Sequence, residues 1–383
     1  MMVNAQRRKR MTPVSNPFKF GIPVSGNTFV NRKKELAELD SLVRNGKSIV
    51  LYSDRRMGKS SLIMEFARTH SEKYIFVVLD LYGLTNKNQV LSNLVGGTIG
   101  ATYSKAGQVL ANISELLRGS TFRLTIGERG EIGIDLTRRS VDIGDMDWAL
   151  NFPEKIALKK GKKLVVVFDE FQELARLDGT PFIKRMRACY QWHKNVTYIF
   201  SGSKRHILHQ IFEEYEGAFY KFARSMELGP ISSAELEDFL KSKFREVGGT
   251  LDDDIAAKMV AICDCHPFYT QHLAHELIGT SLTPTAGDLQ EAVRLLIFRQ
   301  APAFSNTWES IESQIQRSYL VALAQHPGAV PDLEFIDRYN LVSRSHVQKA
   351  EGALERKGLI SKRKVIDPVF ALWLRRLTIE PLW

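Results

Sequence analysis

The chain has only three cysteines among 383 residues, Cys189, Cys263 and Cys265, which is too few for a disulfide framework. It also lacks any apolar run near the ~20 residues that a membrane-spanning helix needs. The basic run Arg7–Arg10 is followed by no apolar segment, so the N-terminus does not read as a secretory signal. These absences exclude secreted disulfide scaffolds and membrane spans and favour a protein of the reducing cytoplasm.

Charged residues make up 25% of the chain and apolar residues 44%, which is ordinary for a globular protein. The length predicts roughly two or three domains. The net charge of +10 favours an acidic partner such as nucleic acid, although it can equally reflect general composition. The tail around Arg7–Arg10 also has two interpretations. It is either a docking site for DNA, RNA or an acidic protein, or a disordered segment without function.

The most informative segment is a phosphate-binding loop. It follows an apolar run, Ser48–Tyr52, and precedes an amphipathic stretch, Leu62–Arg68, in the order strand, loop, helix. The loop matches the pattern G-x-x-x-x-G-K-[ST] except at its first position, where serine replaces glycine. We expect it to bind a nucleoside triphosphate through Ser53, Asp54, Arg55, Arg56, Met57, Gly58, Lys59, Ser60 and Ser61.

The residue types of this loop suit that ligand. Gly58 lets the backbone approach phosphate oxygens, and the N–H groups at the start of the helix attract anions. Lys59 supplies a cation for the β- and γ-phosphates, and the hydroxyl of Ser60 is a ligand for Mg²⁺. The cofactors predicted from the sequence are therefore ATP and Mg²⁺.

A second segment carries the acids that hydrolysis requires. The apolar run Leu164–Phe168 reads as a buried parallel strand, and it ends in Asp169 and Glu170. Because parallel strands bind ligands at their carboxyl ends, we expect both acids beside the phosphate-binding loop, on a neighbouring strand. Asp169 would hold Mg²⁺ with Ser60, and Glu170 would orient or deprotonate the attacking water. The alternative is a pair of solvated acids.

Four further residues are candidates for a role near the γ-phosphate. A third strand, Val196–Phe200, ends at Ser201, which we expect to sense the γ-phosphate with Ser203 behind it, unless this segment is a plain turn. Arg224 is a candidate arginine finger that would act on a neighbouring subunit, and Arg205 competes for that role. An exposed arginine on a helix end is the alternative for each.

The order of strands and helices along the sequence predicts an α/β fold, which is a P-loop NTPase parallel sheet flanked by helices. An all-α lid and a C-terminal winged-helix domain are expected to follow it. Asn31 is the expected cap of the first helix. In the last domain a helix from Ser343 to Lys357 precedes two short strands around a basic turn. The predicted domains are an irregular basic lead-in (1–27), an ATPase core (28–230) with a β-hairpin insertion (120–140), a helical lid (231–304) and a winged-helix domain (305–383).

Together these segments resemble the archaeal-type ATPases, in the STAND branch of AAA+-related P-loop ATPases. The resemblance spans about residues 28–375 and is carried by FVNRKKELAEL from Phe29, SDRRMGKSSL, VVVFDEFQEL, FSGS, CHPFYTQHL from Cys265, and DPVFALW from Asp367. Members usually have glycine where this chain has Ser53 and Cys265. The resemblance implies a nucleotide switch in which Phe29, Val30 and Arg32 lie near the adenine, and His266 and Pro267 lie near the phosphates.

Three functional interpretations stay open. The first is a slowly hydrolysing ATPase switch with an unidentified protein partner. The second is a DNA-binding regulator of transcription, mobile elements or phage defence, with nucleotide as a structural or assembly ligand. The third is a scaffold that self-associates with nucleotide. DNA would be contacted by Arg344, Lys349, Lys362, Arg363 and Lys364, although Glu351 and Glu355 share the same helix and winged helices also bind proteins.

A cluster of cysteines and histidines raises one more alternative. Cys263, Cys265, His266, His272 and His275 are close in sequence, but their spacing does not match a zinc motif. Packing of the lid and contact with phosphate explain the segment better.

Overall fold

The computed structural model describes residues 16–103, 117, 118, 120–126, 132–136, 141–177 and 179–379. The tail with Arg7–Arg10 lies outside these residues. The chain divides into two compact units, which we call the sheet unit (Asn31–Gly229) and the helical unit (Met1–Val30 with Pro230–Trp383). The limits predicted for the individual domains stay predictions.

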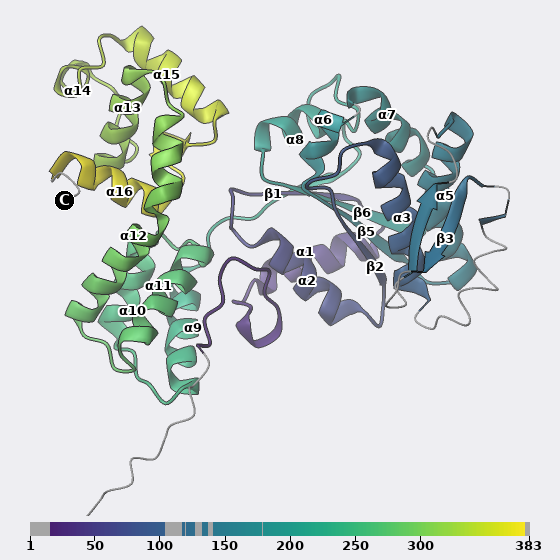
Figure 1. Ribbon diagram of the computed structural model, residues 1–383, viewed down its shortest axis with the longest axis horizontal. Coiled ribbons are helices and arrows are strands. Elements are labelled where there is room, and N and C mark those ends of the chain that lie inside the picture. The colour runs from purple at the N-terminus through teal and green to yellow at the C-terminus, as the bar shows by residue number, and fades with distance from the viewer. Residues whose placement is uncertain are drawn as a thin grey trace, which may run out of the picture. The chain divides into compact units, whose positions relative to one another are not determined.

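The sheet unit contains a five-stranded parallel sheet (Figure 1). Its strands are β1 (Ile49–Tyr52), β2 (Ile75–Asp80), β5 (Leu164–Asp169), β6 (Val196–Gly202) and β7 (Arg224–Glu227). Their order is β2-β5-β6-β1-β7. The predicted parallel α/β sheet is therefore confirmed. The two motif-bearing strands, β1 and β5, are not neighbours as predicted, because β6 pairs with both and lies between them.

Helices cover both faces of this sheet. They are α1 (Lys33–Arg44), α2 (Lys59–His70), α3 (Lys87–Thr102), α5 (Ile143–Lys160), η2 (Phe171–Glu173), α6 (Leu174–Leu177), α7 (Gly179–Tyr190) and α8 (Arg205–Phe212). Side chains alternate along the strands, so that Val50, Val166 and Phe200 share one core with α3, α5, α7 and α8. Figure 1 shows α1 and α2 on the other side of the sheet. Burial on both faces explains the continuous apolar runs in these strands.

Two local predictions have different outcomes. The hairpin insertion is confirmed, since β3 (Phe122–Ile126) pairs antiparallel with β4 (Ile132–Leu136). Asn31 as the helix cap is wrong, because α1 begins at Lys33 and its N-cap is Arg32, which has left-handed backbone (φ 64°). The buried side chain of Arg32 turns to other partners, described below.

The helical unit is all-α except for one short hairpin. Its elements are η1 (Gly26–Thr28), α9 (Ser233–Glu246), α10 (Asp253–Ile262), α11 (Pro267–Thr280), α12 (Ala286–Glu309), α13 (Gln314–Gln325), α14 (Leu333–Arg338), α15 (Arg344–Arg356), β8 (Ile360–Ser361), β9 (Lys364–Val365) and α16 (Pro368–Ile379). The predicted winged-helix elements are present, with Ser343 capping α15. Helix α12 contains Pro302 and continues past it to Glu309.

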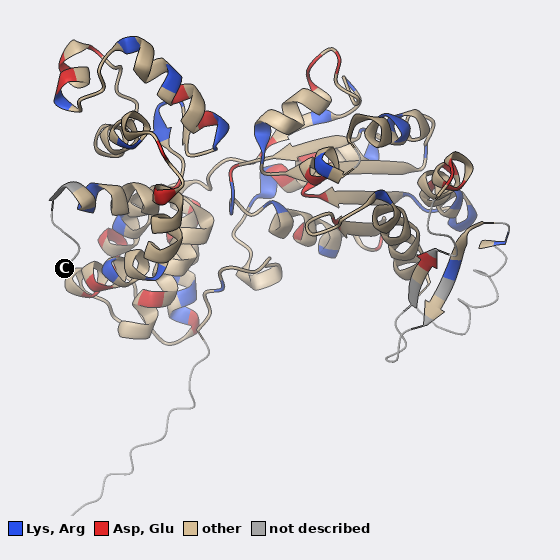
Figure 2. Cartoon of the chain, turned by 45° about the horizontal axis from the view of Figure 1, so that its top comes forward, with Lys and Arg blue, Asp and Glu red and all other residues tan. Residues whose placement is uncertain are grey.

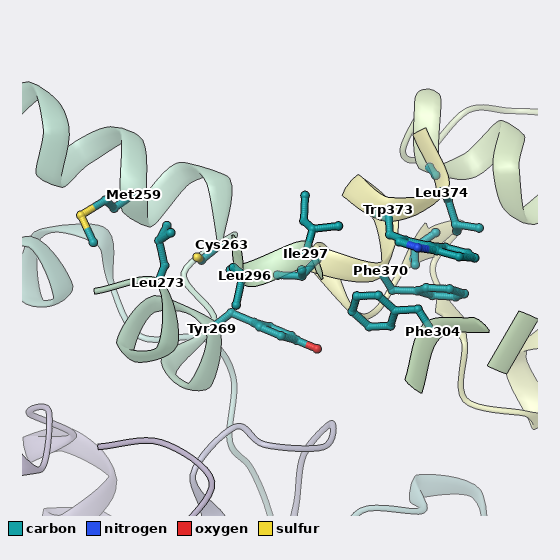
Figure 3. Close-up of a cluster of buried hydrophobic side chains, with 14 of the residues drawn as sticks. Met259, Cys263, Tyr269, Leu273, Leu296, Ile297, Phe304, Phe370, Trp373 and Leu374 are labelled. Carbon is teal, nitrogen blue, oxygen red and sulfur yellow. The ribbon is translucent and has the colours of Figure 1, made fainter. Parts of the chain in front are cut away.

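One hydrophobic core runs through the helical unit. Figure 3 shows Met259 and Leu273 from the lid helices at one end, Tyr269 and Leu296 in the middle, and Phe304, Phe370 and Trp373 packed together at the other end. The ring centroids of Phe304 and Phe370 are 5.2 Å apart. The predicted boundary between residues 304 and 305 falls within α12, so the lid and the winged helix share a helix as well as a core.

The start of the described chain belongs to this core. Phe18, in the segment predicted as irregular, is 2% exposed and packs against Phe239 and Phe244 of α9. Phe20 stacks on His272 of α11 at 3.9 Å between ring centroids. Two aromatic residues therefore fasten a segment without regular structure to the lid helices. Within the described residues, no helix has the length and apolar character that crossing a membrane requires.

Candidate nucleotide site

The phosphate-binding loop joins β1 to α2 at the carboxyl edge of the sheet. Gly58 is the N-cap of α2 and has a φ of 91°, a conformation that strains any residue with a Cβ. Ser60 and Ser61 lie in the first turn of α2, so the loop delivers the N-terminus of the helix to the anion site as predicted from the motif. Arg55 and Arg56 are exposed, and Met57 is buried.

Ser53 does not need the backbone freedom of the glycine that it replaces. It is absent from the residues with positive φ, whereas Arg56 in the same loop has a φ of 62°. Its side chain is fully buried, donates to the carbonyl of Asp54 at 2.8 Å, and accepts a hydrogen bond from Lys59 Nζ at 3.0 Å. The serine thus adds a polar contact to the lysine that is expected to bind phosphate.

Lys59 is a buried cation among oxygens. Its Nζ also approaches the carbonyls of Ser53 and Asp54, each at 3.4 Å. Burial lowers the pKa of Lys59 from its ordinary value, and the carboxylates of Glu170, Asp169 and Asp54 oppose that effect. An anionic ligand would relieve the cost of burying this charge.

Ser60 and Asp169 bring the two predicted halves of the site together. The hydroxyl of Ser60 donates to Asp169 Oδ2 at 2.7 Å, although 109 residues separate them in the sequence. The pair offers a hydroxyl and a carboxylate, which are the oxygen ligands that Mg²⁺ prefers. The residues present therefore fit a magnesium ion at this position.

Glu170 is held by two side chains at the same edge. It has left-handed backbone (φ 53°), and Phe171, which follows it, is fully buried with its ring centroid 4.7 Å from that of Phe200. Glu170 Oε2 accepts hydrogen bonds from Gln172 Nε2 and from the hydroxyl of Ser203, the latter at 3.2 Å. Gln172 was not among the residues predicted from the sequence. Its position, two residues after Glu170 at a strand end, was the signal available.

Ser201 and Ser203, at the end of β6 and just after it, lie in different surroundings. Ser201 is fully buried, and its Oγ has no hydrogen-bond partner among the described residues, which leaves a polar atom at the carboxyl end of β6. Ser203, which we expected to lie behind Ser201, is instead the residue that contacts Glu170. The role predicted for Ser201 stays a prediction.

The two candidate arginines lie at opposite ends of the sheet. Arg224 opens β7 and is paired in register with Ile49 at the start of β1, far from the edge where Tyr52 leads into the loop. Arg205 begins α8 at the carboxyl edge, 4.0 Å from Asp54, with an ion pair to Glu227. Arg205 is thus beside the loop and Arg224 is not. A finger role toward another copy stays a prediction for Arg224.

Arg32 contacts the backbone of the phosphate-binding loop. It is 6% exposed, and its guanidinium donates to the carbonyl of Met57 at 3.3 Å and to that of Gly229 at 2.6 Å, while Glu35 pairs with it at 2.8 Å. Arg32 therefore ties the loop backbone to the end of the sheet unit. Such a role depends on tertiary contacts, so the sequence pattern alone could not reveal it.

The remaining predicted residues belong to the helical unit. Val30 is buried in its core and Phe29 is half-buried. His266 is the N-cap of α11, is 4% exposed and packs against Tyr269 at 5.0 Å between ring centroids, and Pro267 is the first residue of the helix. Their expected contacts to nucleotide stay predictions.

Burial and ring stacking account for cysteine and histidine side chains before α11 and within it. Cys263 is fully buried, and burial raises the pKa of its thiol. His272 stacks on Phe20 and lies 3.4 Å from Glu276. In the ranges that the structure describes, no group of three or more such side chains is arranged to hold a metal ion.

A parallel sheet with this loop, a Ser60–Asp169 contact and an adjoining glutamate defines a P-loop ATPase. The chain belongs to the family described as an ATPase domain predominantly from Archaea, whose model matches residues 29–269. A model of a probable winged helix domain matches residues 302–376. The resemblance to archaeal-type ATPases is therefore confirmed. The comparison with curated proteins found no match.

Two solved structures share the fold. The Walker-type ATPase PABY2304 of Pyrococcus abyssi is 19% identical, with 94% of this chain and 99% of that chain covered at a TM-score of 0.68. The ORC2 protein of Aeropyrum pernix, solved in ADPNP-ADP complexes, is 13% identical, with 91% and 94% covered at a TM-score of 0.57. At these identities the likeness establishes the architecture alone.

Ser53→Gly should raise the affinity for ATP, because it frees Lys59 from one hydrogen bond to a buried hydroxyl. A bond of this kind involving a charged group is worth about 1.5 kcal/mol, which is roughly tenfold in Kd. Titration with a fluorescent ATP analogue measures the change. Ser53→Ala is the matched control, since it removes the hydroxyl and keeps the Cβ. Equal affinities in all three proteins would show that the hydroxyl does not restrain Lys59.

Proposed function

We propose that this protein is an ATP-binding, slowly hydrolysing switch whose nucleotide state sets the arrangement of the lid and the winged helix, and so its access to a partner. The observation that carries the proposal is the hydrogen bond between Ser60 and Asp169, with Glu170 next in the chain. This contact supports the proposal because it brings the expected ligands of phosphate and Mg²⁺ and the candidate base to one edge of one sheet.

Each residue then has a role in hydrolysis. Lys59 would neutralise charge on the β- and γ-phosphates, and Ser60 and Asp169 would hold Mg²⁺, which would supply further positive charge to the phosphates. Glu170 takes the proton of the attacking water. We expect turnover to be slow because Lys59 is already engaged by the hydroxyl of Ser53.

A route from the lid to the winged helix supports the switch. The hydroxyl of Tyr269, in the first turn of α11, donates to Asp367 Oδ2. The other oxygen of Asp367 accepts from the N–H groups of Val369 and Phe370 at the start of α16, at 3.0 and 2.9 Å. A second link joins Asp264, before α11, to Lys364 in the wing. Movement of α11 would therefore move the winged helix.

Glu170→Gln should leave ATP binding unchanged and slow hydrolysis by about 10²–10⁴-fold, because it removes the base but keeps the shape. Lys59→Ala should weaken binding by roughly 100-fold, equivalent to about 3 kcal/mol. Nucleotide titration and single-turnover phosphate release measure the two effects. Glu173→Gln is the matched control, since Glu173 lies on the same η2 turn. Hydrolysis by Glu170→Gln at the wild-type rate would show that Glu170 is not the base.

Tyr269→Phe should uncouple the winged helix from the nucleotide. We expect hydrogen exchange in α16 to differ between the ADP state of the wild type and the ATP state that Glu170→Gln traps. The difference should shrink in Tyr269→Phe, whereas the rate of hydrolysis should stay within about twofold. Tyr319→Phe is the control, because its hydroxyl contacts Glu351 inside the winged helix at 3.3 Å. Equal hydrogen exchange of α16 in the ADP and ATP states, with Tyr269 unchanged, would contradict the switch.

DNA binding is the second candidate function, and exposed cations on the winged helix favour it. Arg344, Lys349 and Lys362 are exposed, and Figure 2 marks basic and acidic residues along α15. Two of the predicted contacts are already engaged, however. Arg363 pairs with Glu351 at 3.1 Å, and Lys364 pairs with Asp264. A DNA site would therefore rest on three cations, with nucleotide as its assembly ligand.

The double variant Arg344→Ala, Lys362→Ala should lower the salt dependence of DNA binding by about two units of slope, because each substitution removes one cation that would neutralise a phosphate. Gel shifts of duplex DNA over a range of salt concentrations measure the slope. Lys364→Ala serves as the control, since that lysine is paired with Asp264. Equal slopes in all three proteins, or no shift by the wild type at low salt, would rule out this surface.

The finer features of the proposal come from the sequence: the location from the low number of cysteines, and the others from the resemblance. They are membership of the STAND branch, low turnover, a cytoplasmic location and an unidentified protein partner, which includes self-association of the kind a scaffold would show.

A further inference from the structure

The segment that follows β5 lies beside the carboxyl end of β6 and the residues just after it. Phe171 packs on Phe200, and Glu173 Oε1 lies 3.5 Å from Lys204 Nζ. Between these two contacts, Gln172 lies against Gly202, the last residue of β6. The two segments are thus joined by an aromatic contact at one end and an ion pair at the other, with a glutamine and a glycine between them.

Gln172 is a buried amide that bonds to Glu170. It is 1% exposed, and its Nε2 donates to Glu170 Oε2. Its Oε1 is buried and accepts no hydrogen bond from any residue that the structure describes. Burying an unpaired amide oxygen opposes folding, so packing alone does not account for a glutamine here. The hydrogen bond to Glu170 is the contact that an apolar residue of similar size could not make.

Gly202 makes the room that this amide occupies. A Cβ at position 202 would overlap Gln172 Oε1 and would lie 3.0 Å from Leu208 Cδ1. Gly202 has no positive φ, so its backbone does not require glycine. Glycine is unfavourable inside a strand and marks places where another group approaches closely. Here the approaching group is the amide that contacts Glu170.

We infer that Gln172 is a positioning residue for Glu170 and that Gly202 is part of the same arrangement. Gln172 and Ser203 hold Oε2, which leaves Oε1 as the oxygen that faces the attacking water. As the water oxygen bonds to the γ-phosphorus, its proton passes to Oε1, and the bond to the bridging oxygen breaks with its electron pair leaving on ADP. The inference rests on the proposed role of Glu170 as the base.

The first test is Gln172→Leu, which keeps the volume and removes the hydrogen bond. The kcat for ATP hydrolysis should fall by about 10- to 100-fold and the KM should stay within about twofold, because ground-state binding does not involve Glu170. The melting temperature should not fall, since the variant removes a buried unpaired oxygen. A purely structural role predicts the reverse, a lower melting temperature with kcat preserved. Gln172→Met is measured in parallel.

The second test couples the two positions. Gly202→Ala should lower kcat as Gln172→Leu does, because the new Cβ displaces the amide. In a Gln172→Ala background, where that space is empty, Gly202→Ala should cost little more. An equal cost of Gly202→Ala in both backgrounds would overturn the inference, as would wild-type kcat in Gln172→Leu and Gln172→Met.

The outcomes also separate this inference from the proposed function. If Glu170→Gln hydrolyses ATP at the wild-type rate, the base assignment fails and the inference fails with it. If Glu170→Gln is slow but both Gln172 variants are as fast as the wild type, only the positioning role fails.

Discussion

The pairing of β6 with both β1 and β5 is the constraint on which the site depends. All three strands are parallel, so their carboxyl ends meet at one edge, and β6 stands between the loop that carries Lys59 and the acids that end β5. Ser60 still reaches Asp169 across this strand. Because β6 separates β1 from β5, residues at the end of β6 have room at this edge. Ser203, which follows β6, contacts Glu170 there.

Local features of the fold could be predicted because they depend on neighbouring residues. The loop around Gly58, the buried strand before Asp169, the hairpin insertion and the capped helix α15 each have a short-range signal. Strand order has none, so the separation of β1 and β5 could not be predicted. The same limit applies to side chains whose roles arise only in the folded chain. Arg32, expected near the adenine, holds the backbone of the loop, and the position of Gln172 two residues after Glu170 does not by itself reveal their contact.

Charge is distributed in a way that composition could not reveal. The net charge of +10 suggests nucleic acid, yet two of the cations in the wing pair with carboxylates of the same unit, Arg363 with Glu351 and Lys364 with Asp264. The pair of Lys364 with Asp264 and the shared core around Phe304 and Phe370 join the winged helix to the lid. The pair of Arg363 with Glu351 lies within the winged helix itself.

Several unfavourable local arrangements occur where nucleotide is expected. Lys59 is a buried cation with a lowered pKa, Glu170 has left-handed backbone, and buried oxygens of Ser201 and Gln172 have no partner among the described residues. Each of these opposes folding, and in most of a protein such features are removed by selection. Because an anionic ligand with bound Mg²⁺ would offset the burial of Lys59, nucleotide should stabilise the sheet unit more than an equal surface contact elsewhere would. A nucleotide would therefore complete this edge, as the proposed switch requires.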